Sequence, residues 1–225
     1  MIKVGFLGTG NMGGAIIRGI AAAYKSEAEI YAYDLDAAKL ADHVKEDTVI
    51  VSIAAGITEE YIMKTTKDKV HTVIVMPNTP FLLGEGATAL AKGTHTTDEE
   101  FEVVKSIFST GGIAEVVPMD RMKEIIAING SSPAFIYLYA KGFIDYAKEN
   151  GIDGDAALRL FAKSLIGSAK MMTESGKTID ELIKMVSSPG GTTLAGLDGL
   201  YQGKLTDVVK DCCERCTKRA YELSK

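Results

Sequence analysis

The stretch that decides the fold is KVGFLGTGNMG, residues 3–13. Its β-branched and aromatic residues predict a strand that runs into a glycine turn, and a helical pattern follows from Gly14 to about Ala23. Gly8 permits a tight turn, Gly10 lets a pyrophosphate approach the backbone, and Gly13 lets the helix and the strand pack closely. The stretch therefore indicates a dinucleotide site at a helix N-terminus, with a purely structural turn as the alternative.

A second predicted strand, Glu29 to Tyr33, ends at Asp34, about 20 residues beyond the turn, where a dinucleotide-binding unit carries its acidic residue. A carboxylate there accepts hydrogen bonds from the adenosine ribose and repels the extra phosphate of NADP. The alternative is a surface acid that begins a turn with Asp36. We expect NADPH or NADH as the cofactor. The cofactor-binding residues predicted in this part are Gly8, Thr9, Gly10, Asn11, Met12, Gly13 and Asp34.

Strands and helices alternate up to Pro118, and only helical patterns follow. The further strands predicted are 48–53, 71–76, 87–91 and 114–117, with helices at 58–65 and 98–109. The later helices are 120–128, 133–149, 154–175, 179–186, one opening at about 192 toward Leu200, and 205–223. The fold class is therefore α/β. A Rossmann-like domain (residues 1–117), with a mostly parallel sheet and helices on both faces, precedes an all-helical domain (residues 118–225).

The sequence MPNTP, residues 76–80, follows a predicted buried strand. Open α/β sheets bind ligands beyond the carboxyl ends of their strands, and two prolines make this loop rigid. We interpret Met76, Pro77 and Asn78 as contacts to the nicotinamide end of the cofactor. A turn that simply stops the strand is an equal alternative.

The sequence SSPGGTT, residues 187–193, opens a predicted helix. Paired glycines with serine and threonine at a helix start bring backbone N–H groups and hydroxyls together, which suits a small carboxylate. Taken alone, an ordinary capped helix start explains the same residues.

Composition sets the class of protein. The chain has 225 residues, of which 46% are apolar and 24% charged, and its net charge is −5. This is an ordinary globular balance that gives no reason to expect nucleic acid or a membrane as a partner. We expect no signal peptide, because the first residues lack a charged n-region, a long apolar run and a small-residue cleavage site. We expect a cytoplasmic location, because the three cysteines crowd into residues 212–216 and suit a reducing compartment. Neither they nor the scattered histidines predict a metal site or a catalytic histidine.

Five segments, taken in chain order, resemble the pyrroline-5-carboxylate reductase family. They are VGFLGTGNMG (4–13), VSIAAG (51–56), MPNTP (76–80), GSSPAF (130–135) and VSSPGGTT (186–193). The resemblance implies reduction of 1-pyrroline-5-carboxylate to L-proline, the last step of proline biosynthesis. It also implies a homodimer interlocked through the helical domain, often assembled into a decamer, with each active site shared between two subunits.

The resemblance further assigns the site residues. The substrate carboxylate would lie on the loop from Ser188 to Thr193, and Thr193 would be the catalytic residue that bonds the ring nitrogen. The substrate-binding residues implied are Ser187, Ser188, Gly190, Gly191, Thr192 and Thr193. A ring imine is protonated without a strong enzymatic acid, so the protein mainly aligns the ring with the nicotinamide.

One departure from the family pattern lies near residues 43–44. A strand–helix unit of roughly 40 residues is absent there. We expect an interruption of the chain between Ala41 and Asp47, next to His43, rather than a true deletion. If the deletion is real, the alternative is a non-catalytic dinucleotide-binding protein. A second alternative is a β-hydroxyacid dehydrogenase-like reductase, which uses a lysine of the helical domain near an asparagine, and the sequences around Lys141 and Lys170 do not match that pattern.

Overall fold

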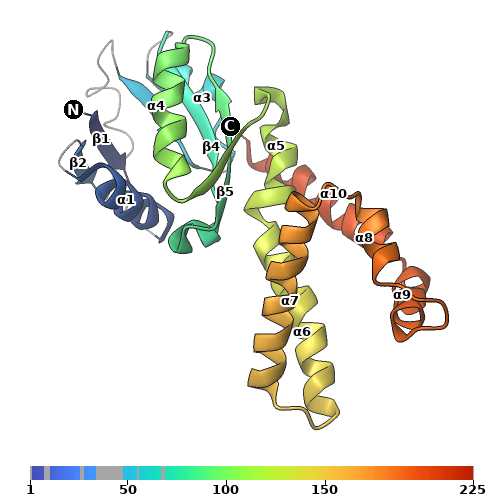
Figure 1. Cartoon of the computed structure of the whole chain (residues 1–225). Coiled ribbons are helices and arrows are strands. Elements are labelled where there is room, and N and C mark those ends of the chain that lie inside the picture. The colour runs from blue at the N-terminus through green and yellow to red at the C-terminus, as the bar shows by residue number, and fades with distance from the viewer. Residues whose placement is uncertain are drawn as a thin grey trace. The chain divides into compact units, whose positions relative to one another are not determined.

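The computed structural model describes residues 2–7, 11–25, 28–33, 48–54, 56–66 and 69–224. The chain forms two compact units (Figure 1). The α/β unit comprises residues 1–133 and 213–225, and the helical unit comprises residues 134–212. The window 41–47, in which we expect an interruption, lies outside the described residues. The division of the chain at Pro118 into a nucleotide domain and a substrate domain stays a prediction.

The strands of the α/β unit form two sheets among the described residues. Strands β1 (Ile2–Leu7) and β2 (Ala28–Tyr33) pair in parallel and are linked by α1 (Asn11–Tyr24). A four-stranded sheet has the order β3-β4-β5-β6. Its strands are β3 (Val49–Ser52), β4 (His71–Met76), β5 (Gly86–Lys92) and β6 (Gly112–Val116), with α3 (Glu59–Thr65) and α4 (Asp98–Ser109) between them.

Strand direction follows the length of each connection. The pairs β3–β4 and β5–β6 are parallel, and each is joined through a helix. Strands β4 and β5 are antiparallel, with Met76 opposite Ala89, because residues 77–85 are too few for a crossover helix. The mostly parallel sheet is confirmed, with the β4–β5 pair as its exception.

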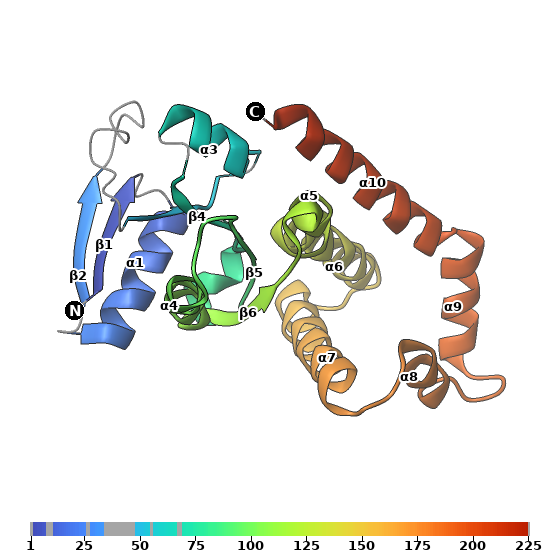
Figure 2. The same ribbon diagram turned by 90° about the horizontal axis from the view of Figure 1, so that it is seen from above.

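The central strands divide the core into two layers, because successive side chains of a strand point to opposite faces. Val73 and Val75 of β4 pack with α1 and α4. Ile74, between them, packs on the other face with Ile62 of α3 and with Met122. Helices thus cover both faces, as the sequence predicts, and Figure 2 shows α3 and α4 on opposite sides of the strands.

Polar caps set the helix starts in this unit. The Thr58 hydroxyl accepts a hydrogen bond from the Tyr61 amide at 3.2 Å, so the predicted cap of α3 is confirmed. Thr97 and Glu100 form a reciprocal capping box at the start of α4. Such caps satisfy amides that have no partner within the helix.

Helices make up the described chain after Pro118. They are η4 (Met119–Arg121), α5 (Met122–Ile125), the π-helical turn η5 (Ile126–Gly130), α6 (Ser132–Glu149), α7 (Gly154–Glu174), α8 (Ile179–Met185), α9 (Thr192–Gln202) and α10 (Leu205–Leu223). No strand follows Pro118 in the part of the chain that the structure describes, as expected. The π-helical turn replaces the end of a helix that we predict as regular over 120–128.

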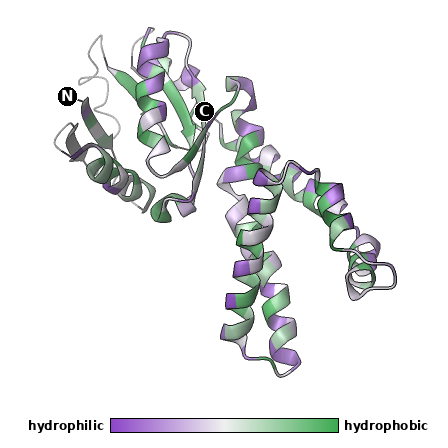
Figure 3. Ribbon diagram, in the orientation of Figure 1, coloured by the Kyte–Doolittle hydropathy of each residue, from purple (hydrophilic) through white to green (hydrophobic). Residues whose placement is uncertain are grey.

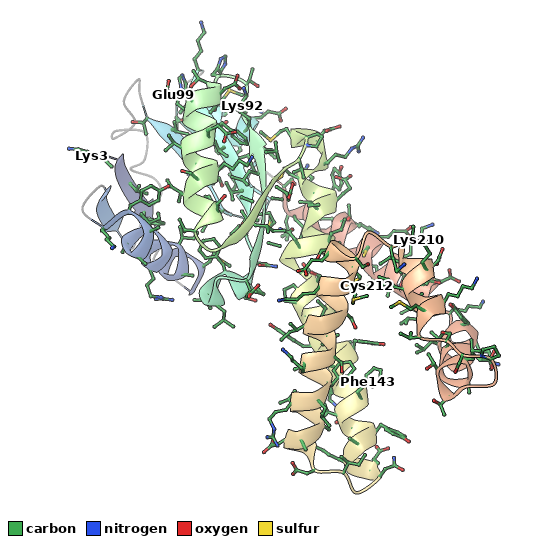
Figure 4. The ribbon with its side chains drawn as sticks, viewed as in Figure 1. Lys3, Lys92, Glu99, Phe143, Lys210 and Cys212 are labelled. Atoms are coloured by element: carbon green, nitrogen blue, oxygen red, sulfur yellow. The ribbon has the colours of Figure 1, made fainter. Side chains whose placement is uncertain are left out.

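Helices α6 and α7 of the helical unit contact each other through aromatic side chains. Phe143, labelled in Figure 4, stacks on Phe161 with ring centroids 4.3 Å apart. Tyr139 packs against both rings. Many large apolar side chains of this hairpin are exposed in the single chain, and Figure 3 shows hydrophobic residues along both helices. The exposed ones in α6 and α7 are Ile136, Tyr137, Leu138, Tyr139, Phe143, Tyr146, Leu158, Leu160, Ile166, Met171 and Met172. Exposed apolar surface of this extent marks an interaction surface. None of the described helices is long and apolar enough to cross a membrane.

Candidate active site

The first turn of α1 carries the part of the glycine motif that the structure describes. Asn11 begins the helix, and Gly13 in its first turn is buried. A buried glycine there fits the close packing that the motif requires. Met12 packs against the core between α1 and α4. Gly8, Thr9, Gly10 and Asp34 lie outside the described residues, and their cofactor roles stay predictions.

Residues 76–80, which we call the proline loop, leave the carboxyl end of β4. Pro77 and Asn78 are buried, and Thr79 begins the 3-10 turn η3 (Thr79–Leu83). The Asn78 Oδ1 atom accepts a hydrogen bond from the Ala87 amide at 2.9 Å. Its Nδ2 atom donates to the Asn129 carbonyl oxygen at 3.2 Å. Both polar atoms of the Asn78 side chain therefore form hydrogen bonds within the protein, and they hold the loop in place. The contact of Met76, Pro77 and Asn78 with the nicotinamide stays a prediction, in which the whole loop rather than the Asn78 amide group meets the ring.

Asn129, in the π-helical turn, is a residue that the sequence reasoning missed. Its Nδ2 atom donates to the carbonyl oxygens of Met76, at 2.7 Å, and Ala87, at 3.0 Å. The Oδ1 atom is buried without a hydrogen-bond partner. The Asn-Gly dipeptide at 129–130 reads in the sequence only as helix punctuation. The Ser131 amide donates an i→i−5 hydrogen bond to the Ile126 carbonyl oxygen, which marks the π-helical turn that contains Asn129. The spacing of apolar residues in the sequence does not indicate such a turn.

Residues 187–193, which we call the anion loop, form a tight turn before α9. The Gly191 amide donates to the Ser188 carbonyl oxygen at 2.9 Å, with Pro189 and Gly190 between them. Gly190 has φ +70°, which glycine adopts at the third position of a type II turn. Before the turn, the Ser187 hydroxyl donates to the Ile183 carbonyl at 2.7 Å, so this hydroxyl is tied to α8.

Helix α9 begins without a side-chain cap. Gly191 occupies the cap position with φ −80° and ψ 162°, and it has no side chain to accept from the first amides of the helix. Those amides, from Thr192 onward, lack intrahelical partners and carry the positive end of the helix dipole. Thr192 and Thr193 are exposed in the first turn, so their hydroxyls flank the free amides. This arrangement fits a small carboxylate beside a group that bonds to a hydroxyl.

No group of three or more metal-ligating side chains occurs among the described residues. His71 lies at the start of β4, and its Nδ1 atom is 2.7 Å from Glu100, the capping residue of α4. This histidine thus has a structural partner at the opposite end of β4 from the proline loop.

Two family models match the chain, one to each half. The model described as NAD binding domain of 6-phosphogluconate dehydrogenase matches residues 3–112. The model described as pyrroline-5-carboxylate reductase dimerisation matches residues 120–223. A pyrroline-5-carboxylate reductase from Bacillus subtilis is 31% identical over 193 residues, covering 84% of this chain and 69% of that protein.

The chain belongs to the pyrroline-5-carboxylate reductase family. Members of this family are NAD(P)H-dependent oxidoreductases. The crystal structure of the Plasmodium falciparum reductase with NADP bound is similar to this chain with a TM-score of 0.90 and 25% identity, over 100% of both chains. The resemblance stated from the sequence is confirmed, and the dimerisation match favours it over the β-hydroxyacid dehydrogenase-like alternative.

The comparison also bears on the number of residues that this chain lacks relative to the family, and the position of the shortfall near residues 43–44 stays a prediction. The alignment with the Escherichia coli reductase has 265 positions at 29% identity and covers 99% of this chain and 98% of that protein. Because this chain has 225 residues, at least 40 positions of the relative have no counterpart here. This agrees with the roughly 40 residues expected for an absent strand–helix unit.

Proposed function

We propose that this protein reduces 1-pyrroline-5-carboxylate to L-proline with NAD(P)H, as the last step of proline biosynthesis. The observation that carries the proposal is the uncapped start of α9 behind the turn from Ser188 to Gly191. Family membership supplies the reaction, and this helix start supplies a place for the carboxylate of its substrate. Its three free cysteines suit a cytoplasmic location.

The anion loop would do most of the substrate binding. The amides of Thr192 and Thr193 would hold the carboxylate, with the Ser188 hydroxyl beside them. The Thr193 hydroxyl would donate a hydrogen bond to the ring nitrogen as it becomes an amine. A threonine hydroxyl is a poor proton donor, so the last proton would come from water. Alignment of the ring, rather than strong acid catalysis, is therefore the main contribution of these residues.

The dinucleotide would lie on the glycine turn and the first turn of α1. The buried Gly13 and the helix start after β1 fit a pyrophosphate at this place. Bound NAD(P)H supplies the hydride that reduces the imine carbon. The proline loop would hold the nicotinamide end, and Asp34 would bind the adenosine ribose.

The test is a steady-state assay with three substrates. Pyrroline-5-carboxylate should be reduced efficiently, and 1-pyrroline, which lacks the carboxylate, should show a kcat/KM lower by about 10- to 100-fold, the loss expected for a charge-assisted hydrogen-bonding site. Oxidation of 3-hydroxy acids should be absent. Equal kcat/KM values for the two imines would contradict the role of the anion loop.

Cofactor choice gives a second prediction. We expect NADH to serve at least as well as NADPH, because the Asp34 carboxylate repels a 2′-phosphate. The measurement is the ratio of kcat/KM for the two cofactors. The Plasmodium falciparum relative was solved with NADP bound, so a strong preference for NADPH here would mean that groups other than Asp34 decide the choice.

Assembly gives a third prediction. We propose a homodimer through the helical unit, further assembled into a decamer, with each active site completed by the partner subunit. The exposed apolar residues of α6 and α7 and the dimerisation match support this. Light scattering after gel filtration should give at least twice the 24.0 kDa of one chain. A monomer with full activity would contradict a shared site.

A non-catalytic dinucleotide-binding protein is the second candidate function. The observation that favours it is the total of at least 40 positions of the relative that have no counterpart here. A purified chain of 24.0 kDa that binds NAD(P)H and reduces none of the three test substrates would support it.

A further inference from the structure

Two buried asparagines hold the proline loop in place, Asn78 within the loop and Asn129 in the π-helical turn. Asn78 and Asn129 are only 7% and 8% exposed. Between them their side chains bind the Ala87 amide, the Ala87 carbonyl and the Met76 carbonyl, and Asn78 also donates to the backbone of Asn129. The end of β4 and the start of β5 are thus fixed to each other and to the π-helical turn.

Folding alone gives a poor reason for an asparagine at position 129. Its Oδ1 atom is buried without a partner, and a buried unpaired acceptor destabilises a fold. The π-helical turn that presents it is itself a rare structure, frequently found at functional sites. What asparagine provides here is a pair of donors that hold Met76 and Ala87 together.

We infer that Asn129 is a positioning residue for hydride transfer. It fixes the proline loop, and through it the wall against which the nicotinamide ring lies. The inference rests on the proposed function, in which this loop faces the nicotinamide. Hydride transfer is sensitive to small displacements of the reacting atoms, so a loop released from Asn129 should slow the chemical step more than it weakens cofactor binding.

The test compares Asn129→Leu with a matched control, Thr96→Val. Leucine is close to asparagine in shape but removes both donors. Thr96 is 4% exposed, and its hydroxyl accepts from the Thr72 amide at 2.8 Å and donates to the Thr72 carbonyl at 2.6 Å. Each variant therefore loses two side-chain hydrogen bonds to the strand backbone. Asn129→Leu loses one at the end of β4 and one at the start of β5, whereas Thr96→Val loses both near the start of β4.

Three measurements separate positioning from stability. For Asn129→Leu we expect kcat with pyrroline-5-carboxylate to fall by about 10-fold or more, and the Kd of NAD(P)H to change by less than about 3-fold, since α1 and the glycine turn still hold the pyrophosphate. The primary deuterium isotope effect on kcat, with deuterium at the transferred position, should rise as hydride transfer becomes rate-limiting. Thr96→Val should lower Tm similarly and leave kcat and the isotope effect unchanged.

Equal kinetics for the two variants would overturn the inference, and so would an unchanged isotope effect in Asn129→Leu. If Asn129→Leu does not fold, Asn129→Ser is the second variant. A wild-type isotope effect in Asn129→Ser would also overturn the inference. An inactive wild-type protein would instead refute the proposed function on which the inference rests, so the two failures are distinguishable.

Discussion

Replacing Gly191 by aspartate should raise the KM for pyrroline-5-carboxylate by about 100-fold, the effect of losing charge-assisted hydrogen bonds worth about 1.5–3 kcal/mol. Gly191 holds the cap position of α9 in an extended conformation that any residue adopts. Aspartate is a favoured cap and accepts from the second or third amide of a helix, here Thr193 or Leu194. The new carboxylate would therefore occupy the amides that the substrate carboxylate needs.

The same change should not unfold the protein. A Cβ atom at position 191 would meet the Ser188 Oγ atom at 2.6 Å, and this hydroxyl lies at the end of a side chain that can rotate away. It would also meet the Ser188 carbonyl oxygen at 3.0 Å, so the backbone of the turn must shift by a few tenths of an ångström. The added cap should keep Tm at or above its wild-type value. The KM for NAD(P)H should stay within about 3-fold, since the cofactor binds elsewhere.

Gly191→Ala is the matched control, because it adds the same Cβ atom without a carboxylate. We expect its KM for the imine to rise by less than about 5-fold. Wild-type KM values in both variants would show that the carboxylate of the substrate binds somewhere other than the anion loop.

Replacing Thr193 by valine should lower kcat by about 10- to 100-fold, since one hydrogen bond to a reacting group contributes about 1–3 kcal/mol. Valine keeps the branched shape and removes the hydroxyl. Thr193 is exposed in the first turn of α9, and valine and threonine have similar helix propensities, so stability should be unchanged.

Thr193→Ser restores the hydroxyl without the methyl group and is the control. Its kcat should return to within about 3-fold of the wild-type value if the hydrogen bond is what matters. Valine and serine variants that both turn over like the wild type would remove Thr193 from the mechanism.

The sequence predicts much of the fold because local chemistry fixes it. Helix α4 begins and ends at the residues expected, Asp98 and Ser109, since Thr97 and Glu100 set its start. The two faces of β4 follow from the alternation of its side chains. The antiparallel direction of β5 was missed, because the pattern of a strand does not encode its direction, and only the short connection over residues 77–85 does.

The candidate site is predictable to the extent that it is local. The turn from Ser188 to Gly191 and the uncapped start of α9 lie where the motif indicates. The network around Asn129 joins residues more than 40 positions apart through a π-helical turn, and neither feature leaves a periodic signal. The motif indicates the loop that contains Asn78, but it does not indicate the partners of the Asn78 side chain. These are the backbone groups of Ala87 and Asn129, which are distant in the sequence.

The yield of L-proline per NAD(P)H oxidised tests the proposed reaction most directly. The intact mass of the same purified protein is recorded with it. We expect one L-proline for each NAD(P)H oxidised, with turnover that depends on both substrates. An intact mass above 24.0 kDa would support an interruption between residues 41 and 47, and a mass of 24.0 kDa would establish a true deletion. Binding of NAD(P)H by the intact protein without any formation of L-proline would contradict the account.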